Sequence, residues 1–476
     1  MTLYDKLDEL RKSDMLPLHM PGHKRSGLIP EMSEIYGYDI TEIDGFDDLH
    51  DATGVISDMQ KRAADLYGAD RAWISVNGSS AAIEAAILSS CKAGDKAIIC
   101  RGSHKSVYYA VELAVIRPVY IEQSFTDGGV LLPPDPEAVL KKCNENKDAK
   151  CVVVTSPTYE GLLSDLKPIA EAAHQNNMAL IVDAAHGAHL FLAGRKEKTA
   201  GDADPISAGA DIVITSLHKM LPAPTQTALL LKGKHSAGSV SEDRLSHYMH
   251  VFQSSSPSYV LMAGIDKCLD YIEKEHEKNF TQTCKLIASF RERLKSLKYI
   301  DVGSQTDTAD PFKAVIRSKS RAVSGRDLYI GLLEDYHIQC EMYASDYALA
   351  FFSEADERET FSRLEAALRA MDDKYEMAGL KADRTFDKNR ISHIPESVMT
   401  PGIAMSRHKT DMSFGDELIG QVCGTYVSIY PPGIPIVIPG EVIDDKIISQ
   451  IEEGMENGLN ITGMKGSDIS VIDDNE

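Results

Sequence analysis

A lysine at the end of an apolar run is the first candidate for chemistry in this sequence. Lys219 closes the segment Thr-Ser-Leu-His-Lys, in which Ser216 and His218 precede it. Most lysines are solvated surface charges, because lysine is almost never fully buried. A lysine that forms a Schiff base must instead be desolvated or lie beside positive charge, so that its amine can be neutral. The end of a buried strand next to His218 offers both conditions, which makes Lys219 a candidate nucleophile.

A carboxylate ends a second apolar run. The residues Leu-Ile-Val at 180–182 lead into Asp183, and His186 follows three residues later. A buried carboxylate needs a cationic partner. A pyridinium N–H would supply one, and the ion pair would keep the ring protonated and able to accept electrons. Asp183 could also be a helix N-cap, and His186 could be a packed structural histidine.

Three further loops follow apolar runs and complete a constellation. Gly78, Ser79 and Ser80 open a helix of small residues, where backbone N–H groups and the positive helix end suit a phosphate, although Gly-Ser is also a common helix cap. His104 could stack on a pyridine ring or be a packed loop histidine. Thr158 could bond the phenolic oxygen of such a ring. Together the loops predict pyridoxal phosphate (PLP), bound covalently by Lys219.

The elements that must position these loops are short apolar runs that alternate with helix-like stretches such as 81–90 and 168–176. This alternation is typical of an α/β fold in which helices cover both faces of a parallel sheet. Ligands in such sheets bind beyond the carboxyl ends of the strands, so the five loops should meet at one edge. The predicted strands are Ala72–Val76, Lys96–Cys100, Pro118–Ile121, Cys151–Thr155, Ala179–Asp183, Asp211–Thr215 and Thr227–Leu231.

The length and composition allow two or three domains, since the chain has 476 residues and 43% hydrophobic content. We expect an irregular N-terminal segment at 1–50, a cofactor-binding domain at 51–300 and a smaller α/β domain at 301–476. A helical run near 266–297 should link the latter two. The acidic residues 467–476 resemble a frayed tail.

Charge and cysteine usage exclude several classes of protein. A net charge of -22 argues against nucleic-acid binding and is compatible with attraction of small cations. The eight cysteines show no C-x-x-C pair, so we expect reduced thiols and no metal site. No run of about 18 apolar residues suggests a membrane span, and no secretory signal precedes the fold. We therefore expect a cytoplasmic protein.

In their order along the chain, these motifs resemble the bacterial-type ornithine/lysine/arginine decarboxylases, which are similar to aspartate aminotransferase in fold. The resemblance covers nearly the whole chain, because Leu-His-Met-Pro-Gly-His-Lys at 18–24 and the segment 430–441 also look like signatures of that family. Ala184 departs from the motifs of that family, which often have Glu at this position, whereas Asp183 and His186 agree with them. The resemblance implies a PLP-dependent fold type I large domain with a mainly parallel sheet, followed by a smaller α/β C-terminal domain.

The resemblance also implies a reaction and its site. The chain would decarboxylate arginine, lysine or ornithine to agmatine, cadaverine or putrescine, with release of CO2, as in polyamine biosynthesis. Lys219 would bind PLP covalently, Asp183 would pair with the ring nitrogen, and His104 would stack on the ring. Further cofactor contacts would come from Gly78, Ser79, Ser80, Thr158, His186, Ser216 and His218. In the family a serine-rich loop like 253–257, here with Ser255 and Ser256, comes from a neighbouring subunit, so we expect a homodimer or a higher oligomer.

Two roles stay open between candidates. After CO2 leaves, either His218 or Lys219 must return a proton to the α-carbon, and His218 is our first hypothesis. The distal cation of the substrate needs an acidic partner. Glu441, at the end of the Pro-Gly-Glu motif, leads the candidates, although it could be a plain surface glutamate. Asp44 and Asp48 belong to a second acidic set in the N-terminal segment.

Other functions use the same residues differently. An aminotransferase or another PLP-dependent lyase could have this fold, but an aminotransferase usually grips the α-carboxylate with a C-terminal arginine, and Arg407 is the nearby candidate. A noncatalytic relative is disfavoured by the intact Asp183, His218 and Lys219. A nucleotide-dependent enzyme is disfavoured because neither G-x-x-x-x-G-K-[ST] nor G-x-G-x-x-G occurs between a strand and a helix.

Overall fold

In this computed structural model the chain divides into two compact units. The structure describes residues 1–126, 128–192, 204–234, 240–303, 309–385, 391–431 and 433–473. The first unit comprises Met1–Ser90, Lys150–Ser156 and Asp165–Lys278, and the second comprises Cys91–Ala149, Pro157–Ser164 and Asn279–Glu476. We describe each unit by itself. The domain boundaries expected at residues 50 and 300 stay a prediction.

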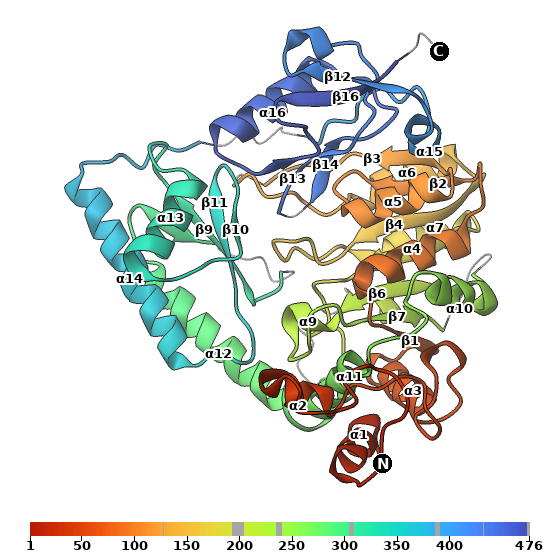
Figure 1. The fold of residues 1–476 in the computed structure, drawn as a ribbon. Coiled ribbons are helices and arrows are strands. Elements are labelled where there is room, and N and C mark those ends of the chain that lie inside the picture. Colours follow the sequence, from red (N-terminus) through yellow and green to blue (C-terminus); the bar gives the residue numbers. More distant parts are fainter. Residues whose placement is uncertain are drawn as a thin grey trace. The chain divides into compact units, whose positions relative to one another are not determined.

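Runs rich in valine, isoleucine and leucine form the strands of the first unit. Their order is β1 (Arg71–Ser75), β7 (Ala228–Lys232), β6 (Ile212–Ser216), β5 (Ala179–Asp183) and β4 (Ala149–Thr155). β4, β5 and β6 are parallel, whereas β7 runs antiparallel to both β6 and β1. Their residues are almost all buried, as strands covered on both faces require (Figure 1).

The second unit contributes the parallel pair β2 (Lys96–Cys100) and β3 (Arg117–Ile121) to what is one seven-stranded sheet in the described chain. The expected α/β fold with a mainly parallel sheet is therefore confirmed. Each strand starts and ends within two residues of its predicted bounds. The agreement reflects how strongly short β-branched runs between turn residues favour buried strands.

Helices of the first unit cover its strands. α4 (Gly78–Ser90) packs on β1, β5, β6 and β7. Its alanines allow this close approach, and nine of its thirteen residues are buried. The predicted helices at 81–90 and 168–176 are confirmed by α4 and by α7 (Leu166–Gln175). The other helices of this unit are α2 (Ser33–Tyr36), α3 (Val55–Tyr67), α8 (Pro205–Ala208), α9 (Leu217–Met220), α10 (Glu242–Val251) and α11 (Tyr259–Tyr271).

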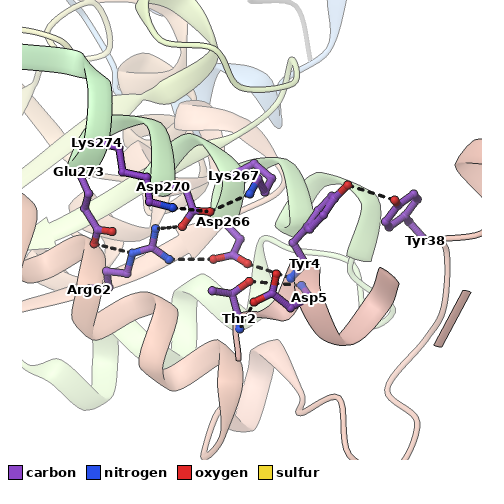
Figure 2. Close-up of polar contacts among 10 residues, drawn as sticks. All are labelled: Thr2, Tyr4, Asp5, Tyr38, Arg62, Asp266, Lys267, Asp270, Glu273 and Lys274. Carbon is purple, nitrogen blue, oxygen red and sulfur yellow. Dashed lines mark hydrogen bonds and ion pairs between the residues drawn. The ribbon is translucent and has the colours of Figure 1, made fainter. Parts of the chain in front are cut away.

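The N-terminal segment is more ordered than expected, because residues Leu3–Lys12 form helix α1, which begins with a capping box between Thr2 and Asp5. An arginine on α3 fastens its surroundings (Figure 2). Arg62 donates to Asp266 (3.0 Å) and to Asp270 (2.5 Å) of α11, and to Glu273 (2.7 Å) just beyond it. The other oxygen of Asp266 accepts the backbone N–H of Tyr4 at 2.8 Å. One buried carboxylate thus ties α1 and α3 to α11.

The predicted helical run near 266–297 is confirmed and contains an irregular turn. α11 continues through a π-helical turn at Ile272–His276 into α12 (Glu277–Leu294), along which the chain passes from the first unit to the second. A single π-turn lets a helix change its register without ending.

The second unit contains an antiparallel sheet in the order β10 (Met342–Tyr343), β11 (Tyr347–Phe351), β9 (Lys313–Ser318) and β8 (Ile300–Val302). α13 (Gly325–Tyr336) packs on this sheet (Figure 1). The remaining helices of this unit are α5 (Lys105–Leu113), α6 (Pro136–Glu145), α14 (Arg358–Met377), α15 (Pro401–Met405) and α16 (Asp445–Glu456).

The C-terminal part of the second unit has its own apolar core. It contains the strand order β14 (Ile434–Val437), β13 (Val427–Ile429) and β15 (Ile461–Thr462), and the pair β12 (Lys409–Ser413) with β16 (Asp468–Ile472). The frayed tail expected at 467–476 is wrong for 468–472. Ile469 and Val471 of β16 are buried in the core with α16, and this burial outweighs the acidic character of the segment. Residues 474–476 lie outside the described residues.

Across the helices that the structure describes, none combines the length and the apolar content that crossing a bilayer requires.

Candidate active site

Asp183 and Lys219 lie at one edge of the first unit's sheet. Asp183 is the last residue of β5, and Lys219 belongs to the short helix α9 that directly follows β6. β5 and β6 are parallel neighbours, so both carboxyl ends face the same way. The amine of Lys219 is 3.1 Å from Nε2 of His186, a residue of the loop that follows Asp183. The expected lysine, histidine and aspartate are therefore together.

Burial controls the charge of Asp183. The side chain is 3% exposed, and this burial raises the pKa of its carboxyl, while the charge of Lys219 and the N–H of Ala185 oppose the rise. The Ala185 N–H lies 3.1 Å from Oδ1. A cation that bonded the carboxylate would reverse the effect of burial, because it would stabilise the ionised form. This is the environment expected of a carboxylate that awaits a pyridinium N–H.

The ring of His218 is fixed by a backbone carbonyl. Its Nδ1 is 3.0 Å from the carbonyl oxygen of Thr227, so Nδ1 carries the donated proton. Burial lowers the pKa of this half-buried imidazole, and the neighbouring Lys219 adds to the effect, whereas the bond to Thr227 opposes it. At neutral pH the ring is therefore neutral, and Nε2 holds a lone pair rather than a proton.

A cradle for an anion lies at the N-terminus of α4. Gly78 adopts φ 76°, and a Cβ there would meet nothing within 4 Å, so the space before it is open. Its N–H donates to the carbonyl of Gln226 at 2.8 Å. Ser79 is half-buried and Ser80 is exposed. The positive helix end, with the N–H groups of its first turn and two serines beside open space, is what a phosphate requires.

Ser216 adds an unsatisfied hydroxyl. It is wholly buried at the end of β6, and its Oγ has no hydrogen-bond partner among the described residues. A buried hydroxyl without a partner can bond a ligand atom, and the hydroxyl of Thr215 on the same strand is unpaired as well. The residues of the first unit therefore fit PLP: Ser216 and the α4 cradle for the phosphate, Asp183 for the ring nitrogen and Lys219 for the aldehyde carbon.

His104 is positioned in the second unit. It is the N-cap of α5, and its Nδ1 accepts the N–H of Ser106 at 3.3 Å and lies 2.9 Å from the Ser106 hydroxyl. Gly433 lies against it. A Cβ at Gly433 would lie 3.7 Å from the edge of the imidazole, and the carbonyl of Gly433 accepts the N–H of Lys105. One edge of the ring is thus supported by Gly433.

Thr158 lies in the loop that follows β4 and is 6% exposed. Its Oγ1 accepts the N–H of Leu162 at 3.2 Å, and its own N–H donates to the carbonyl of Leu162. Its side chain also hydrogen-bonds the carboxyl of Glu160, so the contact expected with the phenolic oxygen of PLP stays a prediction.

The serine-rich loop is anchored at its stem and exposed at its tip. Gln253 accepts the N–H of Val76 at 2.8 Å through its side-chain oxygen, and the carbonyl of Phe252 accepts the amide of Asn77. Ser255 and Ser256 are exposed. Their expected role toward a second subunit stays a prediction.

The N-terminal acidic residues divide into two kinds. Asp47 accepts the N–H groups of Thr53, Gly54 and Ile56 and so caps α3; burial opposes ionisation, but these bonds prevail and lower its pKa. Asp48 is half-buried and caps a 3-10 turn through the N–H of His50, and Asp44 is exposed.

Glu441 is used differently from what the sequence suggested. It is wholly buried, and its two oxygens accept from Arg101, Nη1 to Oε1 at 2.7 Å and Nη2 to Oε2 at 2.9 Å. Oε2 also accepts the N–H of Ile438 at 3.0 Å. This arrangement leaves no side of the carboxylate open to the cation of a substrate. The role considered for Glu441 therefore passes to Asp44 and Asp48 in the proposal below.

Two functional contacts escaped the sequence analysis. Arg101 carried no predicted role, although an arginine directly after a buried strand needs a carboxylate, and the apolar Ile-Pro-Gly-Glu segment offers one. Thr227 was assigned to the start of a strand and Gln226 carried no predicted role, yet their carbonyls fix both His218 and Gly78. No property of a Gln-Thr pair signals such a role.

Comparisons with known proteins define first the class and then the family. A lysine decarboxylase from Francisella novicida superposes with a TM-score of 0.83 at 20% identity, covering 99% of this chain and 81% of that one. L-threonine transaldolase from Pseudomonas fluorescens superposes with 0.55 at 17% identity, covering 68% and 72%. These likenesses show the fold, which is that of fold type I PLP-dependent enzymes.

The sequence comparisons identify the family. The major domain of the Orn/Lys/Arg decarboxylases matches residues 2–339, and their C-terminal domain matches residues 384–455. Arginine decarboxylase of Bacillus subtilis (strain 168) is 32% identical over 484 residues, which cover 99% of this chain and 96% of that protein. The chain belongs to the Orn/Lys/Arg decarboxylase family, as its motifs suggested. Membership implies PLP as the cofactor.

Proposed function

We propose that this chain is a PLP-dependent decarboxylase of basic amino acids whose first substrate is arginine. Family membership supports the reaction, and the 32% identity to an arginine decarboxylase supports arginine over lysine and ornithine. The observation that carries the proposal is the edge formed by β5 and β6, where Asp183 is buried and the Lys219 amine lies 3.1 Å from His186.

PLP, when bound, supplies a protonated ring that accepts the electron pair left as CO2 departs. The chain's own residues do the rest. Asp183 keeps the ring nitrogen protonated, because its ionised form needs that proton donor. Lys219 would supply the amine that holds the cofactor. The imidazole of His186 accepts a proton from the Lys219 amine at 3.1 Å, which helps that amine to become neutral.

We assign the return of a proton to the α-carbon to Lys219 rather than to His218, which was our first hypothesis. The Nδ1 proton of His218 is committed to Thr227, and burial lowers the pKa of the ring, so Nε2 has no proton to give at neutral pH. The ammonium form of Lys219 would carry such a proton. His218 then orients the site and accepts a hydrogen bond at Nε2.

The distal cation of the substrate is assigned to Asp44 and Asp48 in the N-terminal segment. Asp44 is exposed and Asp48 is half-buried, in contrast to Glu441, which is wholly buried and bound by Arg101. A guanidinium prefers two carboxylate oxygens in one plane, whereas an ammonium is satisfied by a single charge. Arginine should therefore depend more strongly than lysine on having both aspartates.

A product assay tests the proposal. The pure protein, loaded with PLP, is incubated in turn with arginine, lysine and ornithine, and then with arginine and 2-oxoglutarate, and CO2, agmatine, cadaverine, putrescine and glutamate are measured. We expect CO2 and agmatine in equal amounts. Glutamate without CO2 would instead indicate an aminotransferase. The arginine that such an enzyme would use, Arg407, is exposed on the turn after α15.

We also propose a homodimer in which Ser255 and Ser256 reach the phosphate of the second subunit, and a cytoplasmic role in polyamine biosynthesis. The exposed tip of the serine-rich loop supports the first, and eight cysteines that are all thiols support a reducing compartment. Sedimentation of the PLP-loaded protein tests the dimer, and a Ser255→Ala/Ser256→Ala variant with unchanged PLP affinity would contradict the shared site.

A further inference from the structure

We propose that Arg101 and Glu441 are positioning residues, which set the ring of His104 at the cofactor without touching substrate or cofactor. The inference rests on the proposed function and on the role that the family resemblance implies for His104, which is to stack on the ring of PLP. Its basis is a buried ion pair between the loop that carries His104 and the Ile-Pro-Gly-Glu segment, residues far apart in sequence within the second unit.

The ion pair holds the guanidinium of Arg101 in one orientation. Arg101 is 3% exposed, and its planar guanidinium binds Glu441 through two parallel bonds and the carbonyl of Ile436 through a third, at 2.9 Å. Such a fork fixes orientation as well as distance. The rings of Tyr108 and Tyr120 lie 5.9 and 5.0 Å from the guanidinium carbon, and the Tyr108 hydroxyl donates to the carbonyl of Arg101. Main chain and side chain of Arg101 are therefore both held.

The fixed arginine is connected to His104 by a short and crowded path. The N–H of Gly102 donates to the Gln123 side chain at 2.8 Å, and a Cβ at Gly102 would lie 2.2 Å from Leu131. The N–H of Ser103 returns to the carbonyl of Cys100. The main chain between Arg101 and His104 is therefore held at both intervening residues, which is the path by which we propose that the ion pair positions the histidine.

The same segment supports His104 at its far end. Lys105 donates to the carbonyl of Gly433, and Gly433 lies against the imidazole edge. The loop 101–105 is thus tied to the segment 433–441 at both ends, by a backbone bond at Gly433 and by the ion pair at Glu441. The imidazole sits between these two ties.

Packing alone does not hold this loop. A cavity of about 240 Å³ runs along it, lined in part by Arg101, Gly102, Ile434 and Ile436. Residues beside a cavity lack contacts on one side, so their position depends on the directional bonds that remain. Burial raises the pKa of Glu441, and the charge of Arg101 opposes that rise; loss of either partner would leave the other charge buried alone.

A double-mutant cycle separates positioning from mere stability. Glu441→Gln and His104→Ala are made singly and together, and the PLP dissociation constant and the pH titration of the bound-cofactor absorbance are measured. We expect Glu441→Gln to weaken PLP binding about tenfold when His104 is present and less than about twofold when it is absent. Equal effects in both backgrounds would overturn the inference.

Two further variants guard against a change in folding alone. Arg101→Lys keeps the buried charge but lacks the fork, so it should shift the cofactor absorbance while the melting temperature of the apoprotein changes little. Arg291→Met is the matched control, since that half-buried guanidinium binds the carbonyls of Pro311 and Lys313 instead, and it should lower the melting temperature without altering the absorbance. If Arg101→Lys behaves like Arg291→Met, the pair is structural only. A wild-type protein that failed to bind PLP would instead reject the proposed function.

Discussion

Asp183 pairs in register with Ile214, so the carboxylate that ends β5 lies level with the strand that leads to Lys219. Two residues that carry opposite ends of the proposed chemistry are therefore set by one pair of parallel strands. The spacing between them depends on the backbone ladder and not on flexible loops. This relationship makes the predictions below specific to single side chains.

Lys219→Ala should abolish covalent binding of PLP. Borohydride treatment followed by mass spectrometry of peptides should find the reduced cofactor on Lys219 in the wild-type protein and on no residue in the variant. Lys167→Ala, which removes an exposed lysine of α7, is the control and should keep the adduct. An adduct that persists in Lys219→Ala would move the nucleophile elsewhere.

Asp183→Asn should separate stability from activity. Burial raises the folded-state pKa of Asp183 above 3.8, so folded apoprotein binds this proton more tightly than unfolded chain. The contribution of the residue to stability is then fully present below pH 3.8 and is lost as pH rises through the folded pKa. Asparagine does not ionise, so the variant does not lose this stability as pH rises. Its apoprotein should be more stable than wild type at neutral pH, while kcat/KM falls about 100-fold or more.

Urea unfolding of both apoproteins at several pH values measures this effect. The difference between variant and wild type should grow as pH rises from the acidic range and then level off. An apoprotein that is less stable than wild type at neutral pH would show that the carboxylate has another cationic partner in the fold.

Ser216→Ala should weaken PLP binding without weakening the fold. A hydrogen bond to a charged group contributes about 1.5–3 kcal/mol, so the dissociation constant should rise about 10- to 100-fold. Thr215→Val is the matched control, because its hydroxyl is also buried but points to the opposite face of the strand. Fluorescence titration of apoprotein with PLP measures both. Equal losses in the two variants would contradict a phosphate contact at Ser216.

Arg62→Met should destabilise the first unit, because Asp266 is buried and would keep only the N–H of Tyr4 (Figure 2). Leaving a buried carboxylate short of donors costs about 1–3 kcal/mol in the free energy of unfolding. Lys274→Ala removes an exposed partner of Asp270 and should change it by less than about 0.5 kcal/mol. Similar changes in the free energy of unfolding for both variants would show that the Arg62 ion pairs contribute no more than exposed ones.

Local signals predicted the strands and their loops well. Val152–Val154 and Leu180–Val182 are β-branched or leucine-rich runs, and their burial in a parallel sheet follows from composition alone. The loops after them had to meet at one edge, which is why Asp183, His186 and Lys219 could be named in advance. The role of Ser216 toward the phosphate stays a prediction, drawn from its place three residues before the lysine.

Long-range pairings could not be predicted in the same way. Nothing local to Glu441 tells that its partner is Arg101, so an acidic residue in a signature motif suggested a substrate contact. The C-terminal strand was missed for a related reason: the acidic neighbours of Ile469 and Val471 indicated a solvated tail, and only the partner strand β12 makes their burial possible. Helix α1 was missed because its apolar face finds its partner far away, on α11.

The reversed direction of β7 sets a limit on how this enzyme can vary. At the carboxyl edge of β5 and β6 the chain leaves these two strands, whereas at the same edge it enters the antiparallel strand β7. Gln226 and Thr227 directly precede β7. Their backbone carbonyls accept hydrogen bonds from Gly78 and His218, respectively. Although these contacts are made by the backbone, a substitution would be tolerated only where it keeps the positive φ of 79° at Gln226 and the buried hydroxyl of Thr227, which donates to the carbonyl of Pro224 at 2.7 Å. A single inserted or deleted residue in the turn before them would not be tolerated, since it would displace two parts of the site at once.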